Sequence, residues 1–224
     1  MAEPVVELTG LSRRYGTDPP VDALRSVDLV VAPGEWLAVV GPSGSGKSTL
    51  LNILGCLDVP TSGSYRFGGV DVAALTDRQR AGLRSNGIGF VFQTFHLLSH
   101  RPVVENVELA ELYRHEGRAG RRARALRALE QVGLSHRADF LPTRLSGGEK
   151  QRAAIARSLM VPPRLLLCDE PTGNLDSGTT ESILGLFTAL NDDGLTIVMI
   201  THEHDVAERA ARRVRIIDGT LTAA

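Results

Sequence analysis

The chain has 224 residues, with 25 basic and 26 acidic side chains and a formal net charge of −1. Proteins that grip nucleic acid usually present a basic surface, so the balanced charge argues against a nucleic-acid partner. The length fits one α/β domain, or one such domain that carries a small subdomain. Cys56 and Cys168 lie in apolar surroundings, so we expect buried free thiols, with a disulfide as the minority alternative.

The apolar runs are too short to cross a bilayer. They cover Trp36–Val40, 165–168 and 197–200, whereas a membrane helix needs roughly 20 apolar residues. The first eight residues include two acids and no basic, apolar leader, so a signal peptide is not expected. Any role at a membrane is therefore expected to come through a partner.

The first 92 residues predict mostly strands. Residues 5–8 and 23–31 have strand-like patterns, and Trp36–Val40 suits a buried central strand. Lys47–Leu54 then predicts a helix that stops at Gly55. Residues 64–67 and 70–72 predict a hairpin around two glycines, and Ile88–Phe92 predicts a further apolar strand.

A complete phosphate-loop motif lies between the strand at 36–40 and the helix at 47–54. Its glycines let the backbone amides point at phosphate oxygens, and the helix N-terminus adds a positive dipole end. Lys47 is expected to reach the β- and γ-phosphates, and the Ser48 hydroxyl to ligate Mg²⁺. The residues expected to bind the nucleotide here are Gly41, Pro42, Ser43, Gly44, Ser45, Gly46, Lys47, Ser48 and Thr49.

The middle of the chain changes to helical patterns rich in Ala, Leu, Glu and Arg. Residues 103–113 and 121–132 both predict helices. In the second, Leu126, Leu129 and Val132 are expected to share one face, with arginines on the other. We therefore expect a helical subdomain, roughly 97–160, inserted into one domain that spans residues 1–224.

Strand patterns return at 165–168, Thr196–Ile200 and 214–217, separated by helices of which the first starts after Asp176-Ser177. This alternation predicts a mainly parallel sheet. The first of these strands ends in two acids. Asp169 is placed to hold Mg²⁺, and Glu170 to polarise the attacking water.

Together these segments resemble the ATP-binding cassette family over nearly the whole chain. The resemblance implies a P-loop NTPase core with a mainly parallel sheet, an N-terminal antiparallel β subdomain and the inserted helical subdomain. It also implies further site residues. Tyr15 would stack on adenine, Gln93 would touch Mg²⁺ or the attacking water, and Asp176 would face a partner subunit. His202 would contact the γ-phosphate from the carboxyl end of the strand at 196–200.

The segment at 145–151, Leu-Ser-Gly-Gly-Glu-Lys-Gln, matches the signature of that family. Ser146, Gly147, Gly148 and Glu149 open a helical stretch, so hydroxyl, backbone amides and helix dipole can converge on a phosphate. The chain already has a phosphate loop. The resemblance implies that the signature serves the ATP of the opposite subunit, with two ATPs held between two head-to-tail copies.

Local sequence around 51–63 and 89–98 resembles the MacB and LolD group of this family. That resemblance implies a soluble ATPase that drives a separate transmembrane permease with a large extracytoplasmic domain, at the cytoplasmic face of the membrane. A non-transporting regulator, such as a cell-division signalling ATPase, stays open as the alternative.

Two surface features bear on partners. Phe95, Leu97 and Leu98 follow Gln93, where the family docks a permease helix; core packing between subdomains is an equally good interpretation of each side chain. Arginines at 118, 121, 122, 124 and 127 predict a solvated helix face, with attraction to anionic lipid as the minority alternative.

Overall fold

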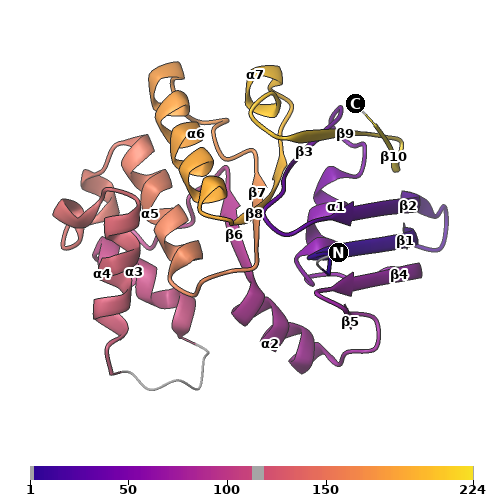
Figure 1. The fold of residues 1–224 in the computed structure, drawn as a ribbon, viewed down its shortest axis with the longest axis horizontal. Coiled ribbons are helices and arrows are strands. Elements are labelled where there is room, and N and C mark those ends of the chain that lie inside the picture. The colour runs from indigo at the N-terminus through magenta and orange to yellow at the C-terminus, as the bar shows by residue number, and fades with distance from the viewer. Residues whose placement is uncertain (1–2, 113–118, 224) are drawn as a thin grey trace.

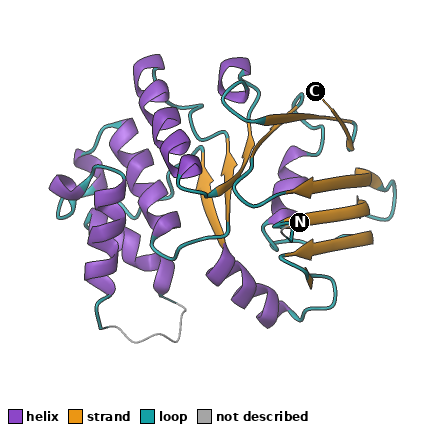
Figure 2. Ribbon diagram, in the orientation of Figure 1, coloured by secondary structure: helices purple, strands orange, loops and turns teal. Residues whose placement is uncertain are grey.

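The computed structural model describes residues 3–112 and 119–223. A central sheet stands between a group of helices and a smaller sheet, as Figure 1 shows. Figure 2 shows the same division by colour, with most helices on one side of the central sheet and the other strands on the opposite side.

The smaller sheet is antiparallel and has the strand order β2-β1-β4-β5. Its strands are β1 (Val6–Tyr15), β2 (Val21–Val31), β4 (Ser62–Phe67) and β5 (Val70–Asp71). The predicted hairpin is therefore confirmed. β1 is longer than predicted because its last residues are polar and exposed, and so lack the apolar alternation that marks its buried start.

The central sheet has the order β10-β9-β3-β8-β7-β6 and is parallel except for β10. Its strands are β3 (Trp36–Val40), β6 (Ile88–Phe92), β7 (Leu165–Asp169), β8 (Thr196–Ile200), β9 (Arg212–Ile217) and β10 (Thr220–Ala223). The expected α/β fold with a mainly parallel sheet is confirmed. The edge strand β10 was not predicted, since its short sequence carries little apolar signal.

The two faces of the central sheet belong to two different hydrophobic cores. Leu165 and Leu167 of β7 pack towards α1 and the antiparallel sheet, whereas Leu166 and Cys168 pack towards the helices. This alternation follows from the period of two in a strand. The central sheet therefore has a hydrophobic core on each face, and packing on both faces holds the residues at its carboxyl edge in place.

Both cysteines are free and buried, as expected. Burial raises the pKa of the Cys56 thiol to about 11, and burial also raises the pKa of the Cys168 thiol.

The helices are α1 (Lys47–Leu54), α2 (Asp77–Gly87), α3 (Val103–Glu108), α4 (Arg121–Gln131), α5 (Gly147–Leu159), α6 (Ser177–Asp192) and α7 (His204–Ala207), with short 3₁₀ turns at Leu109–Glu111, Ser135–Arg137 and Pro142–Arg144. The helix predicted over 103–113 becomes α3 followed by a 3₁₀ turn, and its last predicted residue lies outside the described residues. No helix in the described ranges is long and apolar enough to span a bilayer.

The helix α2 was missed because Gly87 is its only buried residue, so it has no apolar periodicity. A local signal was present nonetheless. The Thr76 side chain accepts from the Gln79 N–H, and the Gln79 side chain accepts from the Thr76 N–H. This capping box is readable in sequence and marks a helix start.

Two expectations for α4 were only partly right, since Leu129 and Val132 are buried and Arg122 and Arg127 are exposed as predicted. Its buried face consists of Ala125, Ala128 and Leu129, while Leu126 is exposed. The arginines are also not simply a solvated face. Arg124 forms an ion pair with the buried carboxylate of Glu111, because a buried charge needs a partner. Arg118 of the predicted basic run lies outside the described residues.

Candidate nucleotide site

The loop from Gly41 to Ser48 connects β3 to α1 and has a backbone that only glycine tolerates at two points. Gly46 has φ +107°, and a Cβ there would lie 2.4 Å from the Ala23 carbonyl oxygen. A Cβ on Gly41 would lie 2.3 Å from the Ile216 carbonyl oxygen. No side chain caps α1, so its first N–H groups are free to bind an anion.

Lys47 lies inside this loop. The side-chain ammonium Nζ donates to the carbonyl oxygens of Gly41 (2.8 Å) and Pro42 (2.6 Å). Among the described residues it has no carboxylate ion pair, although the side chain is almost buried. A buried ammonium held only by neutral carbonyls is well placed to attract phosphate.

Asp169 and Glu170 occupy the carboxyl end of β7. Burial raises the pKa of Asp169; the neighbouring Glu170 charge adds to this, and Lys47 opposes it. Glu170 has φ +45°, a left-handed conformation that costs about 1–2 kcal/mol for a non-glycine residue. Strain of this kind persists where the surrounding structure enforces it, often at functional sites.

His202 lies directly after β8 and contacts Glu170. Its Nδ1 is 2.8 Å from Glu170 Oε1. The histidine side chain is 61% exposed and the glutamate 24%, so the pair opens towards solvent and is accessible to a substrate.

These groups surround a cavity of about 850 Å³. Predicted residues that line it are Gly41, Pro42, Ser43, Gly44, Gly46, Lys47, Ser48, Thr49, Asp169, Glu170 and His202. Residues not predicted are Val21, Asp22, Ala23, Arg25, Asp218 and Gly219. The Asp-Gly dipeptide was a readable turn signal; it turns β9 into β10 and places Gly219 beside the phosphate loop, where Gly219 N donates to Ser45 O (3.0 Å).

Ser45 and Tyr15, both predicted to bind the nucleotide of their own copy, do not line this cavity. Ser45 is buried, and its hydroxyl has no hydrogen-bond partner among the described residues. Tyr15 lies near the surface, where its hydroxyl donates to Asp58 Oδ2 (2.6 Å). The guanidinium of Arg13 lies 4.4 Å from the Tyr15 ring centroid and covers one face of that ring.

The signature segment forms the N-terminus of α5, away from the cavity. The Ser146 hydroxyl accepts from the Glu149 N–H (3.2 Å), and a Glu149 carboxylate oxygen accepts from the Ser146 N–H (2.8 Å). This backbone hydrogen bond is the main reason that the pKa of Glu149 is lowered, with Arg137 contributing. A Cβ on Gly148 would lie 2.5 Å from Thr179 Cγ2, so α5 packs closely on α6.

Gln93 and Asp176 also lie outside the cavity lining. Gln93 Nε2 is 3.4 Å from Asn174 Oδ1, and Asn174 Nδ2 donates to the Gln93 carbonyl oxygen (3.2 Å). Asp176 is the N-cap of α6, where it accepts from the Thr179 N–H (3.0 Å) and hydroxyl (2.7 Å). The structure therefore brings the rest of the loop, the strand-end acids and His202 together, and leaves Tyr15, Ser45, Gln93, Asp176 and the signature outside the cavity lining.

A strand–loop–helix phosphate site that faces two strand-end acids defines a P-loop nucleotide hydrolase. A family model described as "ABC transporter" matches residues 24–173. The chain belongs to the ABC transporter family, and its function is that of an ATP-binding, ATP-hydrolysing transporter subunit.

Curated relatives are similar over almost all of the chain. The uncharacterized ABC transporter ATP-binding protein YvrO of Bacillus subtilis (strain 168) is 50% identical over 97% of this chain and 95% of its own length. The macrolide export ATP-binding/permease protein MacB of Marinobacter nauticus is 48% identical over 97% of this chain. The chain spans only 34% of that MacB relative's length.

A solved structure supports the same assignment. The ATP-binding cassette MJ0796, described as a dimer in a post-hydrolysis state bound to ADP and Pi, is 40% identical to this chain. The two superpose with a TM-score of 0.87 over 97% of this chain and 98% of that one.

Proposed function

We propose that two copies of the chain close head to tail around two ATP molecules, and that this closure drives a membrane permease. The proposal rests on one observation: each copy has two segments suited to bind phosphate, the loop at 41–48 and the N-terminus of α5, and they do not line the same cavity. The loop at 41–48 lines the cavity, whereas the Ser146 end of α5 does not. ATP favours closure because it contacts both copies only in the closed state.

In each composite site the loop residues of one copy hold the triphosphate. Lys47 leaves the two loop carbonyls and binds the β- and γ-phosphates. Tyr15, which is 36% exposed, offers adenine the ring face opposite Arg13. Ser146, Gly147 and Gly148 of the other copy face the γ-phosphate, and Asp176 lies at the contact between the copies.

Mg²⁺ fits the remaining oxygen donors. Ser48 supplies a hydroxyl, Gln93 an amide oxygen and Asp169 a carboxylate, and Mg²⁺ prefers such oxygen ligands. The Asp169 carboxylate is half-buried and receives no hydrogen bond from the described residues, so its oxygens are available to a cation. When bound, Mg²⁺ would offset charge on the phosphates.

Glu170 is proposed as the general base. Its Oε1 accepts the proton of the attacking water, while His202, held at 2.8 Å from the same oxygen, contacts the γ-phosphate. Its position in the cavity lining, on a backbone with φ +45°, supports this role.

Glu170→Gln tests this assignment because it keeps the shape of the side chain and removes its basicity. We expect ATP binding to persist, hydrolysis to fall to near zero and an ATP-bound dimer to accumulate, measured by phosphate release and by size-exclusion chromatography with light scattering. Wild-type turnover in this variant would exclude Glu170 as the base.

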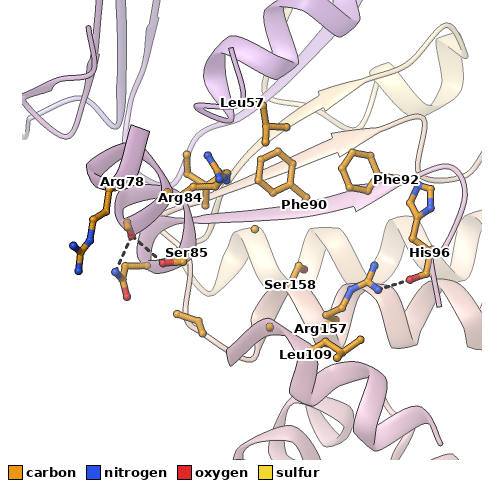
Figure 3. A pocket seen from close by; sticks show the side chains of 17 residues that line it. Leu57, Arg78, Arg84, Ser85, Phe90, Phe92, His96, Leu109, Arg157 and Ser158 are labelled. Carbon is orange, nitrogen blue, oxygen red and sulfur yellow. Dashed lines mark hydrogen bonds between the residues drawn. The ribbon is translucent and has the colours of Figure 1, made fainter. Parts of the chain in front are cut away.

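The proposed docking surface for the permease is a groove beside β6, shown in Figure 3. It has a volume of about 1320 Å³ and runs between α2, the floor strand β6 and the helical subdomain. Phe90 and Phe92 stack in its floor, with ring centroids 5.8 Å apart. His96, which the sequence gave no reason to select, lines the groove, whereas Phe95, Leu97 and Leu98 do not.

The charge of the groove indicates what occupies it. Arg78, Arg84 and Arg157 line it, none forms an ion pair with another described residue, and no acid lines it. The Arg157 guanidinium donates hydrogen bonds to the backbone carbonyl oxygens of Phe95 and His96. We infer a short permease helix that places apolar side chains on the phenylalanines and carboxylates near the arginines.

This second proposal is tested in membranes of the native host. Arg78→Glu should reduce co-purification of a permease while leaving the ATPase rate of the isolated chain unchanged; Arg127→Glu on the exposed face of α4 is the matched control. If the Arg78→Glu variant still co-purified with the permease at the wild-type level, the groove would be excluded as the docking surface. A permease with a large extracytoplasmic domain fits transport from the cytoplasmic face of the membrane, and recovery of a division complex instead would favour the signalling alternative.

A further inference from the structure

Gln151 is a fully buried polar side chain in the signature helix. It lies one turn beyond Gly147 in α5 and has no solvent exposure. Buried polar groups are normally held by hydrogen bonds, so its partners show what fixes it there.

The side-chain amide of Gln151 connects three segments that are distant in sequence. Its Nε2 donates to the carbonyl oxygen of Pro171 (2.6 Å), and at 3.4 Å to that of Phe92. Pro171 directly follows Glu170, and Phe92 directly precedes Gln93. One amide thus contacts the chain next to both residues proposed to act at the terminal phosphate.

The same two loops also contact each other directly. Gln93 and Asn174 exchange hydrogen bonds of 3.4 and 3.2 Å. A Cβ on Gly173 would lie 2.7 Å from Gln93 Nε2, so the Gln93 side-chain amide packs closely against this glycine. Gln151 adds the third attachment, to α5, whose N-terminal end carries Ser146.

Packing alone does not explain a glutamine here. Gln151 Oε1 has no hydrogen-bond partner among the described residues, and an unpaired buried oxygen is unfavourable. A methionine would fill similar space without that oxygen. The feature that methionine lacks is the pair of N–H donors aimed at the two loops.

We propose that Gln151 is a positioning residue that makes the signature helix and the loops carrying Gln93 and Glu170 move as one unit. This rests on the proposed function, in which Glu170 and Gln93 act on the ATP of one copy and Ser146 on the ATP of the other. When the dimer closes, the Gln151 amide transmits the position of α5 to the Glu170 carboxylate of the same copy.

Gln151→Met tests the proposal in the full chain. We expect kcat to fall about tenfold, the scale of one lost hydrogen bond in the transition state, while the ATP affinity of the monomer stays within about twofold, because the loop at 41–48 is untouched. ATP-dependent dimerisation should weaken in parallel with kcat. Gln151→Asn has a shorter side chain that cannot reach both carbonyls, so it should also lower kcat while leaving ATP affinity unchanged. This variant replaces Gln151→Met if the methionine variant does not fold.

Ile155→Val is the matched control, since Ile155 lies one turn further along α5 in the helical core and contacts neither loop carbonyl by a hydrogen bond. Equal loss of kcat in both variants at equal thermal stability would overturn the positioning role, as would wild-type kcat in Gln151→Met. Glu170→Gln, assayed in the same experiment, distinguishes failure of the proposed function from failure of the inference about Gln151. If that variant hydrolyses ATP normally, the proposed function fails; if it is inactive and Gln151→Met is not impaired, only the present inference fails.

Discussion

Ser146 is proposed to have two duties, one in folding and one in catalysis, and two substitutions separate them. As the N-cap of α5 its hydroxyl accepts from the Glu149 N–H at 3.2 Å. Ser146→Ala removes this acceptor but leaves the reciprocal bond, in which the Ser146 N–H donates to Glu149. Loss of half of a capping box should cost about 1 kcal/mol, or roughly 2–4 °C in melting temperature for a domain of this size.

Ser146→Asp keeps a good capping oxygen, so the melting temperature should stay near that of the wild type. Its carboxylate would face the γ-phosphate of the partner's ATP. Two unit charges roughly 4 Å apart at an effective dielectric constant of about 20 repel by about 4 kcal/mol. The homodimer has two such contacts, so the repulsion totals about 8 kcal/mol and ATP-dependent dimerisation should weaken about a million-fold.

Thermal unfolding by circular dichroism gives the first quantity, and analytical ultracentrifugation of both variants in the Glu170→Gln background gives the second. An unchanged melting temperature in Ser146→Ala would refute the capping argument. Wild-type dimerisation of Ser146→Asp would refute the placement of Ser146 against a phosphate.

Three further predictions concern the loop and the signature helix. Lys47→Ala should weaken ATP binding by at least about 1.5–3 kcal/mol, the value of a charged hydrogen bond, measured with a fluorescent ATP analogue; unchanged affinity would contradict the phosphate-loop assignment. Gly46→Ala should destabilise the fold and weaken ATP binding, because its Cβ would lie 2.4 Å from Ala23 O at φ +107°. Gly185→Ala, in α6 with nothing within 4 Å of its Cβ, should instead stabilise by about 0.5–1 kcal/mol. Glu149 has a lowered pKa in the fold, so its stabilising effect is present above its unfolded pKa and is lost as pH falls through the folded value. Glu149→Gln should therefore lose less stability than the wild type when the pH falls from about 5 to about 3, as measured by urea unfolding. Identical pH dependence in the two proteins would argue against a stabilising role of the Glu149 carboxylate.

Prediction from sequence succeeded where one physical signal dominated. Lys47–Leu54 was predicted with the bounds that α1 has, because a phosphate loop starts it and Gly55 ends it. Trp36–Val40 was also predicted without error, since a short, wholly apolar run suits a strand covered on both faces.

Prediction failed where contacts between distant segments determine which residues are buried or paired. Leu126 is exposed, whereas Ala125 and Ala128 are buried, because close packing on α4 requires small residues and the apolar pattern does not reveal this. The lining of the groove beside β6 could not be predicted because α2, which forms one wall, is polar almost throughout. The role of Gln151 was invisible in sequence, since its partners are backbone carbonyls 20 and 59 residues away.

The burial of both cysteines has a practical consequence. Cys168 is fully buried and Cys56 is 3% exposed, and the raised pKa of each thiol keeps it in the unreactive protonated form at neutral pH. The natural chain is therefore a ready background for single-cysteine labelling. A cysteine placed at Arg127, on the exposed face of α4, would be the one reactive thiol, and a spin label there would measure the distance between copies through a full cycle of ATP turnover.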